Sequence, residues 1–101
     1  MISVNKCNDM TDVRANIDRL DSIIVPLLSE RAGYIVQAAG FKPTLADVVV
    51  PERIEFIVNK VRAQAEQEGG DPDLMEKLYR AMMDIYIASE AEHWKRLRGV
   101  E

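Results

Sequence analysis

Cysteine and histidine are almost absent from this sequence of 101 residues, which has one of each, Cys7 and His93. A single cysteine excludes a disulfide within the chain, and one cysteine with one histidine excludes the usual zinc-ligand spacings. The same two residues, near opposite ends, form no nucleophile–base pair, and no glycine-rich phosphate loop is present. We therefore expect no metal site, no cofactor and no covalent catalysis.

Positive charge is also scarce, since 13 lysines and arginines against 17 aspartates and glutamates give a net charge of −4. Nucleic-acid binding requires a basic face, so we expect no nucleic-acid partner and only a local cationic site. No apolar stretch approaches the ~18 residues of a membrane span, and Met1 to Lys6 lack the apolar run of a signal peptide. The expected location is cytoplasmic, without a membrane partner.

What the sequence does contain is ordinary globular composition, 48% hydrophobic and 30% charged. This length and composition predict one domain spanning residues 1–101. A monomer of this size buries only roughly 60–70% of its unfolded surface. A chain with long apolar stripes therefore has reason to share its core with a second copy, and we expect a homodimer.

Apolar residues recur at intervals of three and four, which predicts an all-α chain of three helices with short connections. The first helix is long, at about residues 11–41, and ends before Lys42-Pro43. Its apolar stripe consists of Val13, Ile17, Leu20, Ile24, Leu27, Ile35 and Ala38. Pro26 lies inside this helix and removes the hydrogen bond to the carbonyl of Ser22, at ~3 kcal/mol or more in a straight helix. The helix is expected either to kink or to break into two there.

The second and third helices each open on a proline followed by an acid, Pro51-Glu52 and Pro72-Asp73. The second ends at Gly69-Gly70. The third has two neighbouring apolar faces, which predicts that it is the most buried of the three. Residues 43–50 end in three valines, but no partner strand exists elsewhere, so we predict no sheet.

Two cations interrupt the apolar pattern of the first helix, Arg31 and Lys42. Eleven residues correspond to about 1100°, so the two side chains point within roughly 20° of each other, with Ile35 and Ala38 between them. Their Cα atoms would lie ~16 Å apart, and both side chains are long enough to hold opposite ends of one small anionic ligand. The alternative is that both side chains extend to solvent at the edge of the helix.

Arg14 is a third cationic candidate on the same helix. It precedes Arg31 by seventeen residues, which places it ~26 Å away and roughly 100° around the helix. It can join the same ligand only from a second copy packed antiparallel. The alternative is a surface ion pair with Asp18 at i+4.

Several short segments together resemble the all-helical chorismate mutases and, within that family, the isochorismate pyruvate-lyases of salicylate and siderophore biosynthesis. The resemblance runs in collinear order from residue 7 to about 96. The segments that carry it are Asp12-Val13-Arg14, Ile17-Asp18-Arg19-Leu20-Asp21, Leu28, Arg31, Phe41-Lys42, Pro51-Glu52-Arg53, Tyr86-Ile87-Ala88-Ser89-Glu90 and Trp94.

The resemblance implies an intertwined homodimer of three-helix chains with two equivalent sites for a small dicarboxylate. By this match Arg31, with Arg14 of the partner chain, binds the carboxylates, and Lys42 lies near the ether oxygen of the substrate. Glu90 would be the hydrogen-bonding residue of the last helix, although it can also be read as a solvated glutamate. The predicted catalytic residues are Lys42 and Glu90, and the predicted substrate-binding residues are Arg14, Arg31, Ile35, Ala38, Glu52, Ile57, Tyr86 and Ile87.

Three positions bear on the choice between lyase and mutase. Pro51 and Val48 stand where the mutases usually carry an arginine and often an aspartate, which favours the lyase. Glu90 stands where the lyase and many mutases carry glutamine, which favours a mutase. Glu52 matches the glutamate that can contact the ring hydroxyl, or it is simply an acid in the first turn of a helix.

The function implied is a cofactor-independent pericyclic enzyme that acts on isochorismate, giving salicylate and pyruvate, with weak chorismate mutase activity. The first alternative is a dedicated mutase that converts chorismate to prephenate. The second is a non-catalytic helical module for dimerisation or regulation. The sequence decides neither the substrate nor the protonation state of Glu90. An ether oxygen and an ionised carboxylate both only accept hydrogen bonds, so Glu90 can contact the ether oxygen only if it carries a proton.

Overall fold

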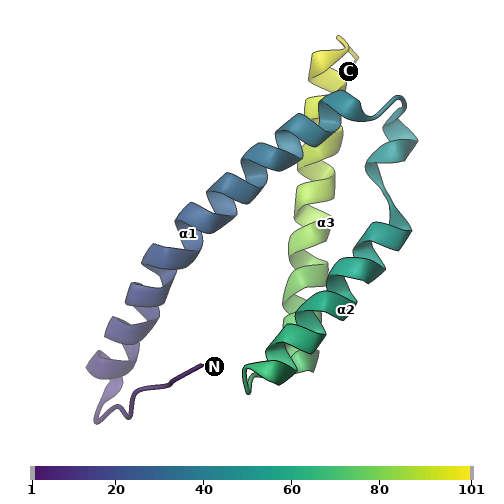
Figure 1. Cartoon of the computed structure of the whole chain (residues 1–101). Coiled ribbons are helices and arrows are strands. Elements are labelled where there is room, and N and C mark those ends of the chain that lie inside the picture. The colour runs from purple at the N-terminus through teal and green to yellow at the C-terminus, as the bar shows by residue number, and fades with distance from the viewer. Residues whose placement is uncertain (1, 101) are drawn as a thin grey trace.

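The computed structural model of the chain describes residues 2–100, and these residues form helices without any strand. The three α-helices are α1 (Met10–Phe41), α2 (Pro51–Gln67) and α3 (Pro72–Leu97), and a 3-10 helix, η1 (Leu45–Val48), connects α1 to α2 (Figure 1). The predicted all-α fold with a long first helix is confirmed. Residues 43–50 contain η1 and no strand, as predicted.

Side-chain caps and prolines set where the helices begin. The carboxylate of Asp9 accepts a hydrogen bond from the backbone N–H of Asp12 at 2.9 Å and starts α1 at Met10, one residue before the predicted start. Asp71 caps α3 in the same way. Pro51 and Pro72 occupy the first positions of α2 and α3, where the missing N–H would have no helical partner.

Pro26 lies inside α1, and the helix is continuous on both sides of it from Met10 to Phe41. Of the two outcomes left open by the sequence, a break into two helices is therefore wrong. Proline removes a single hydrogen bond, the one to the carbonyl of Ser22. The rest of α1 stays helical despite this loss.

The third helix is the central element of the fold. It contacts both α1 and α2, and in Figure 1 it runs beside α2, while the C-terminal half of α1 meets the C-terminal half of α3. A larger share of its residues is buried or half-buried than in either other helix, as predicted. The N-terminal half of α1 diverges from α2 and α3 (Figure 1).

This divergence leaves the chain elongated and its apolar surface exposed. The radius of gyration is 17.0 Å, against about 13 Å for a compact domain of this length. The buried apolar residues are few and mostly small: Ala39, Val48, Val58, Ala65 and Met83. The middle of the predicted stripe of α1 does not pack within the chain, because Ile17, Leu20, Ile24 and Leu27 are each 44 to 62% exposed.

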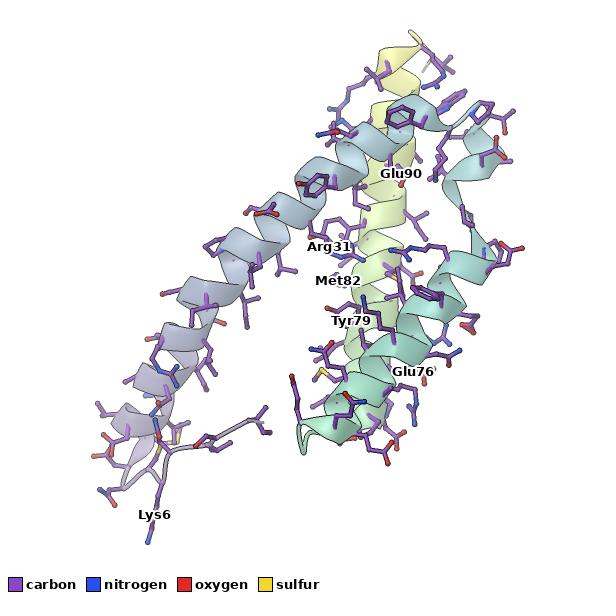
Figure 2. All side chains as sticks on the ribbon, in the orientation of Figure 1. Lys6, Arg31, Glu76, Tyr79, Met82 and Glu90 are labelled. Atoms are coloured by element: carbon purple, nitrogen blue, oxygen red, sulfur yellow. The ribbon has the colours of Figure 1, made fainter. Side chains whose placement is uncertain are left out.

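A chain of ion pairs joins α2 to α3 at the end away from α1. Arg62 contacts Asp73 and Glu76, both at 2.9 Å, and Arg80 contacts Glu76 at 2.7 Å and Glu55 at 2.9 Å. Figure 2 shows Glu76 where the two helices lie side by side. The hydrogen bond from Arg80 holds the pKa of Glu76 below its ordinary value of 4.5, and the charges of both arginines act in the same direction.

Glu76→Gln should destabilise the protein at neutral pH and have less effect in acid. Because the pKa of Glu76 is lowered in the folded chain, its stabilising contribution is present above pH 4.5 and is lost as pH falls through the lowered pKa. Urea denaturation of parent and variant at pH 7, 4.5 and 3, at one protein concentration, measures this difference. Glu66→Gln, at an exposed position of α2, is the control. A difference that stays constant over this range would contradict the expectation.

Candidate active site

A pocket of about 550 Å³ lies between the C-terminal half of α1, η1, the start of α2 and the middle of α3. One part of its wall is apolar, formed by Ile35, Ala38, Val48, Val50, Ile54, Ile57, Met83 and Ile87. The polar lining residues are Arg31, Tyr34, Lys42, Arg53, Tyr86 and Glu90. The lining thus carries three cations and one carboxylate, which suits a small anion with an apolar body.

Lys42 and Glu90 meet in this pocket from different helices. Lys42 is the first residue after α1, and its Nζ lies 3.0 Å from Oε2 of Glu90 on α3. The ammonium also donates to the carbonyl oxygen of Asp47 at 3.1 Å. The side chain of Glu90 is only 6% exposed and that of Lys42 is 23% exposed. Glu90 is therefore not a solvated glutamate, and Lys42 does not extend freely to solvent.

Arg31 approaches the same pocket from α1 (Figure 2). Its guanidinium lies over the ring of Tyr86, 4.8 Å from the centroid, and the hydroxyl of Tyr86 donates to the carbonyl of Leu28 at 2.8 Å. Nη1 of Arg31 is buried and has no hydrogen-bond partner among residues 2–100. A planar guanidinium with a free buried donor is suited to a carboxylate.

The pocket brings together eight of the ten predicted site residues: Arg31, Ile35, Ala38, Lys42, Ile57, Tyr86, Ile87 and Glu90. Arg14 and Glu52 do not line it. Arg14 is exposed near the opposite end of α1, too far along the helix to reach Arg31 in the same chain, and it forms none of the ion pairs found within residues 2–100. Glu52 is exposed in the first turn of α2.

Several lining residues were not among the predicted set, and two of them are polar, Tyr34 and Arg53. Arg53 is exposed at the rim of the pocket and lies over the ring of Phe56, 5.2 Å from its centroid. Helical spacing could have predicted a third lining residue, Met83, because it precedes Tyr86 and Ile87 by three and four residues and so shares their face of α3. The approach of Arg53 depends on how the segment at 43–50 turns, which periodicity does not reveal.

The chain matches known proteins over most of its length. Residues 13–91 match the sequence profile of chorismate mutase type II. The chain belongs to this family. A relative, the isochorismate pyruvate lyase of Pseudomonas aeruginosa, is 33% identical over 93 residues, which cover 92% of each protein. The T-protein of Enterobacter agglomerans is 30% identical over 91 residues, which cover 88% of this chain and 24% of that protein.

Membership of the type II chorismate mutase family makes this chain an enzyme. The profile match runs from Val13 to Ala91 and so includes Arg14, Arg31, Lys42 and Glu90. Within residues 2–100, no helix is long and apolar enough to cross a membrane. The same residues hold no group of three histidine, cysteine or acidic side chains placed to bind a metal ion.

Replacing Glu90 with alanine would leave the half-buried ammonium of Lys42 without its counter-charge. We expect Glu90→Ala to lower the free energy of unfolding by about 2–3 kcal/mol, measured by urea denaturation at pH 7 and one protein concentration. Glu92→Ala, at an exposed position of the same helix, is the matched control and should stay within about 0.5 kcal/mol of the parent. Equal effects of the two substitutions would contradict a stabilising role of the Lys42–Glu90 pair.

Proposed function

We propose that the chain is an isochorismate pyruvate-lyase, which converts isochorismate to salicylate and pyruvate and has weak chorismate mutase activity at the same site. The observation that carries this proposal is the pocket itself. Its lining includes Nη1 of Arg31, which is buried and has no partner among residues 2–100, and the ammonium of Lys42 just after the end of α1, with the apolar residues Ile35 and Ala38 between them. A small dicarboxylate with an ether bond fits such a lining.

The reaction is pericyclic and needs neither a base nor a nucleophile. Isochorismate transfers a hydrogen from its ring to the enolpyruvyl methylene group while the ether bond between ring and side chain breaks. The protein supplies a compact conformer, held through the carboxylates, and a cation where negative charge develops on the ether oxygen. We assign the first task to Arg31 and the second to Lys42.

The contacts of Lys42 support its role at the ether oxygen. An ammonium has three hydrogens to donate, and the side chain of Glu90 and the backbone carbonyl of Asp47 accept two of them. One donor remains for a substrate atom. Glu90, paired with Lys42 at 3.0 Å, orients the ammonium and compensates its charge.

The composition of the wall favours one of the two candidate reactions. Val48, which is 4% exposed, and Val50 line the pocket. The mutases often carry an aspartate at the position of Val48 and usually carry an arginine at that of Pro51. An apolar wall here favours the lyase, as does the identity of 33% to a lyase. A dedicated chorismate mutase is the second candidate, and Glu90 in place of glutamine is the observation that favours it.

A homodimer with shared sites completes the proposal. The accessible surface of the chain is 7677 Å², against roughly 5,800 Å² for a folded monomer of this mass. The excess of roughly 1,900 Å² is larger than the ~800 Å² that each partner buries in a standard interface. Packing the exposed stripe of α1 against a second copy would bury this surface, and Arg14 of one chain would then reach the pocket of its partner.

Incubating the purified protein with isochorismate and, separately, with chorismate tests the proposed function. Formation of salicylate, followed by its fluorescence, together with slower formation of prephenate supports the lyase. Prephenate formation alone identifies the dedicated mutase. Turnover of neither acid would overturn the proposal.

Lys42→Ala should lower kcat by about 10²–10³-fold, because it removes a charge that acts mainly on the transition state. Steady-state kinetics with the preferred acid measures this loss. Lys60→Ala, which removes an exposed lysine of α2, is the matched control and should leave kcat unchanged. A loss confined to KM would show that Lys42 holds only the ground-state ligand.

Mixtures of inactive variants test the shared sites. Arg14→Ala and Arg31→Ala proteins, unfolded and refolded together in equal amounts, should regain about a quarter of the parent activity, because half of the dimers are mixed and each has one intact site of two. Arg31→Ala mixed with Lys42→Ala is the matched control. Both of its substitutions fall in pockets built by their own chains, so no intact site forms. Equal activity of the two mixtures would refute shared sites.

A further inference from the structure

The C-terminal end of α1 is held by side chains of α3. A helix leaves its last carbonyl groups without helical partners, and at this end Arg98 takes two of the backbone oxygens. Its Nη1 donates to the carbonyl of Ala39 at 3.3 Å and its Nη2 to the carbonyl of Lys42 at 2.7 Å. The indole Nε1 of Trp94 donates to the same Lys42 carbonyl at 2.9 Å.

Trp94 and Arg98 act as one unit. The guanidinium of Arg98 lies over the indole ring, 4.4 Å from its centroid, and its Nη1 also approaches the backbone carbonyl of Trp94 at 3.5 Å. The stacked pair therefore presents two donors to one acceptor, the carbonyl oxygen of Lys42. Loss of either side chain leaves the carbonyl of Lys42 with one donor instead of two and removes the stacking contact that holds the other side chain.

The same face of α3 holds the other end of Lys42. Glu90 and Trp94 lie four residues apart on α3, and Arg98, the residue directly after Leu97, follows four residues later, so the three lie along one side of the helix. Glu90 binds the ammonium, whereas Trp94 and Arg98 bind the backbone carbonyl. Lys42 is thus fixed at both ends by one rigid element.

This fixation matters because Lys42 lies just outside α1, with extended backbone angles φ −88° and ψ 121°. No helical hydrogen bond holds its carbonyl, and its side chain is a flexible chain of four carbons. A catalytic charge that is misplaced by about 1 Å can lose about 10²-fold in rate. The backbone of Lys42 therefore needs an external support, and Trp94 and Arg98 are the side chains that contact it.

We propose that Trp94 and Arg98 are positioning residues that hold the ammonium of Lys42 at the breaking bond by fixing its backbone carbonyl. Their effect on catalysis rests on the proposed function of Lys42. Their effect on the placement of Lys42 does not, because it follows from the hydrogen bonds alone.

Trp94→Phe removes the indole N–H and keeps an aromatic ring, and Arg98→Gln removes the forked donor at an exposed position. Each should lower kcat by about tenfold with KM within about twofold, because the charge is kept and only misplaced. Arg96→Gln, an exposed arginine of the same last turn, is the matched control and should leave both constants unchanged. A loss in KM alone, or unchanged kcat in both variants, would overturn the proposal.

Combination with Lys42→Ala separates positioning from general stability. If Trp94 and Arg98 act through Lys42, then Trp94→Phe and Arg98→Gln should cause no further loss of kcat in the Lys42→Ala background. A further tenfold loss there would show that they act by another route and would overturn the proposal. Arg98→Gln alone decides the question if Trp94→Phe does not fold, as checked by circular dichroism.

A measurement without turnover distinguishes failure of this inference from failure of the proposed function. The sequence has only five lysines, at 6, 42, 60, 77 and 95, so an NMR spectrum of protein with ¹³C-labelled lysine Cε is simple to assign by the signal lost in Lys42→Ala. In Trp94→Phe and Arg98→Gln the Lys42 signal should move toward that of a mobile lysine, and in Arg96→Gln it should not. An unchanged Lys42 signal in all three variants would overturn the proposal, whatever reaction the protein performs.

Discussion

A half-buried ammonium group needs a counter-charge, and in this chain Glu90 supplies it to Lys42 across a distance of 3.0 Å. The pair lies where α1 ends and joins this end of α1 to α3, which also binds the carbonyl of Lys42 through Trp94. The pocket opens beside the pair, and its remaining walls come from η1 and the start of α2. The position of the site in the fold therefore follows from where this one ion pair can form.

Apolar and charged side chains have different places in the pocket. Apolar residues from all four elements form the body of the wall, and charge is limited to a few side chains at its edges. A chain with a net charge of −4 attracts an anion only where cations are gathered. Arg31 and Lys42 gather that charge on one face of one helix, and their separation along the helix sets the length of ligand that can touch both.

Local patterns were enough to predict the helices and the four predicted pocket residues from Arg31 to Lys42, whereas the resemblance to a family supplied the four on α2 and α3. Pro51 and Pro72 mark the first turns of α2 and α3 because proline fixes the backbone without needing a donor, and the spacing of eleven residues places Arg31 and Lys42 on one face regardless of tertiary contacts. The burial of Glu90 follows instead from the packing of α3 against the end of α1, and only the resemblance to a family indicated it. The approach of Arg53 to the pocket depends on the turn at 43–50, and the role proposed for Arg14 depends on a second chain. Periodicity within one chain therefore predicts neither.

The free donor of Arg31 has a consequence for stability. A buried guanidinium nitrogen that has no hydrogen-bond partner among residues 2–100 destabilises the folded chain by about 1–3 kcal/mol. An apolar residue of similar length, such as methionine, would pack against Tyr86 without an unpaired donor and would make the chain more stable at this position. Stability therefore does not account for an arginine here, and the ligand recognition that we propose for Arg31 is a demand that opposes it.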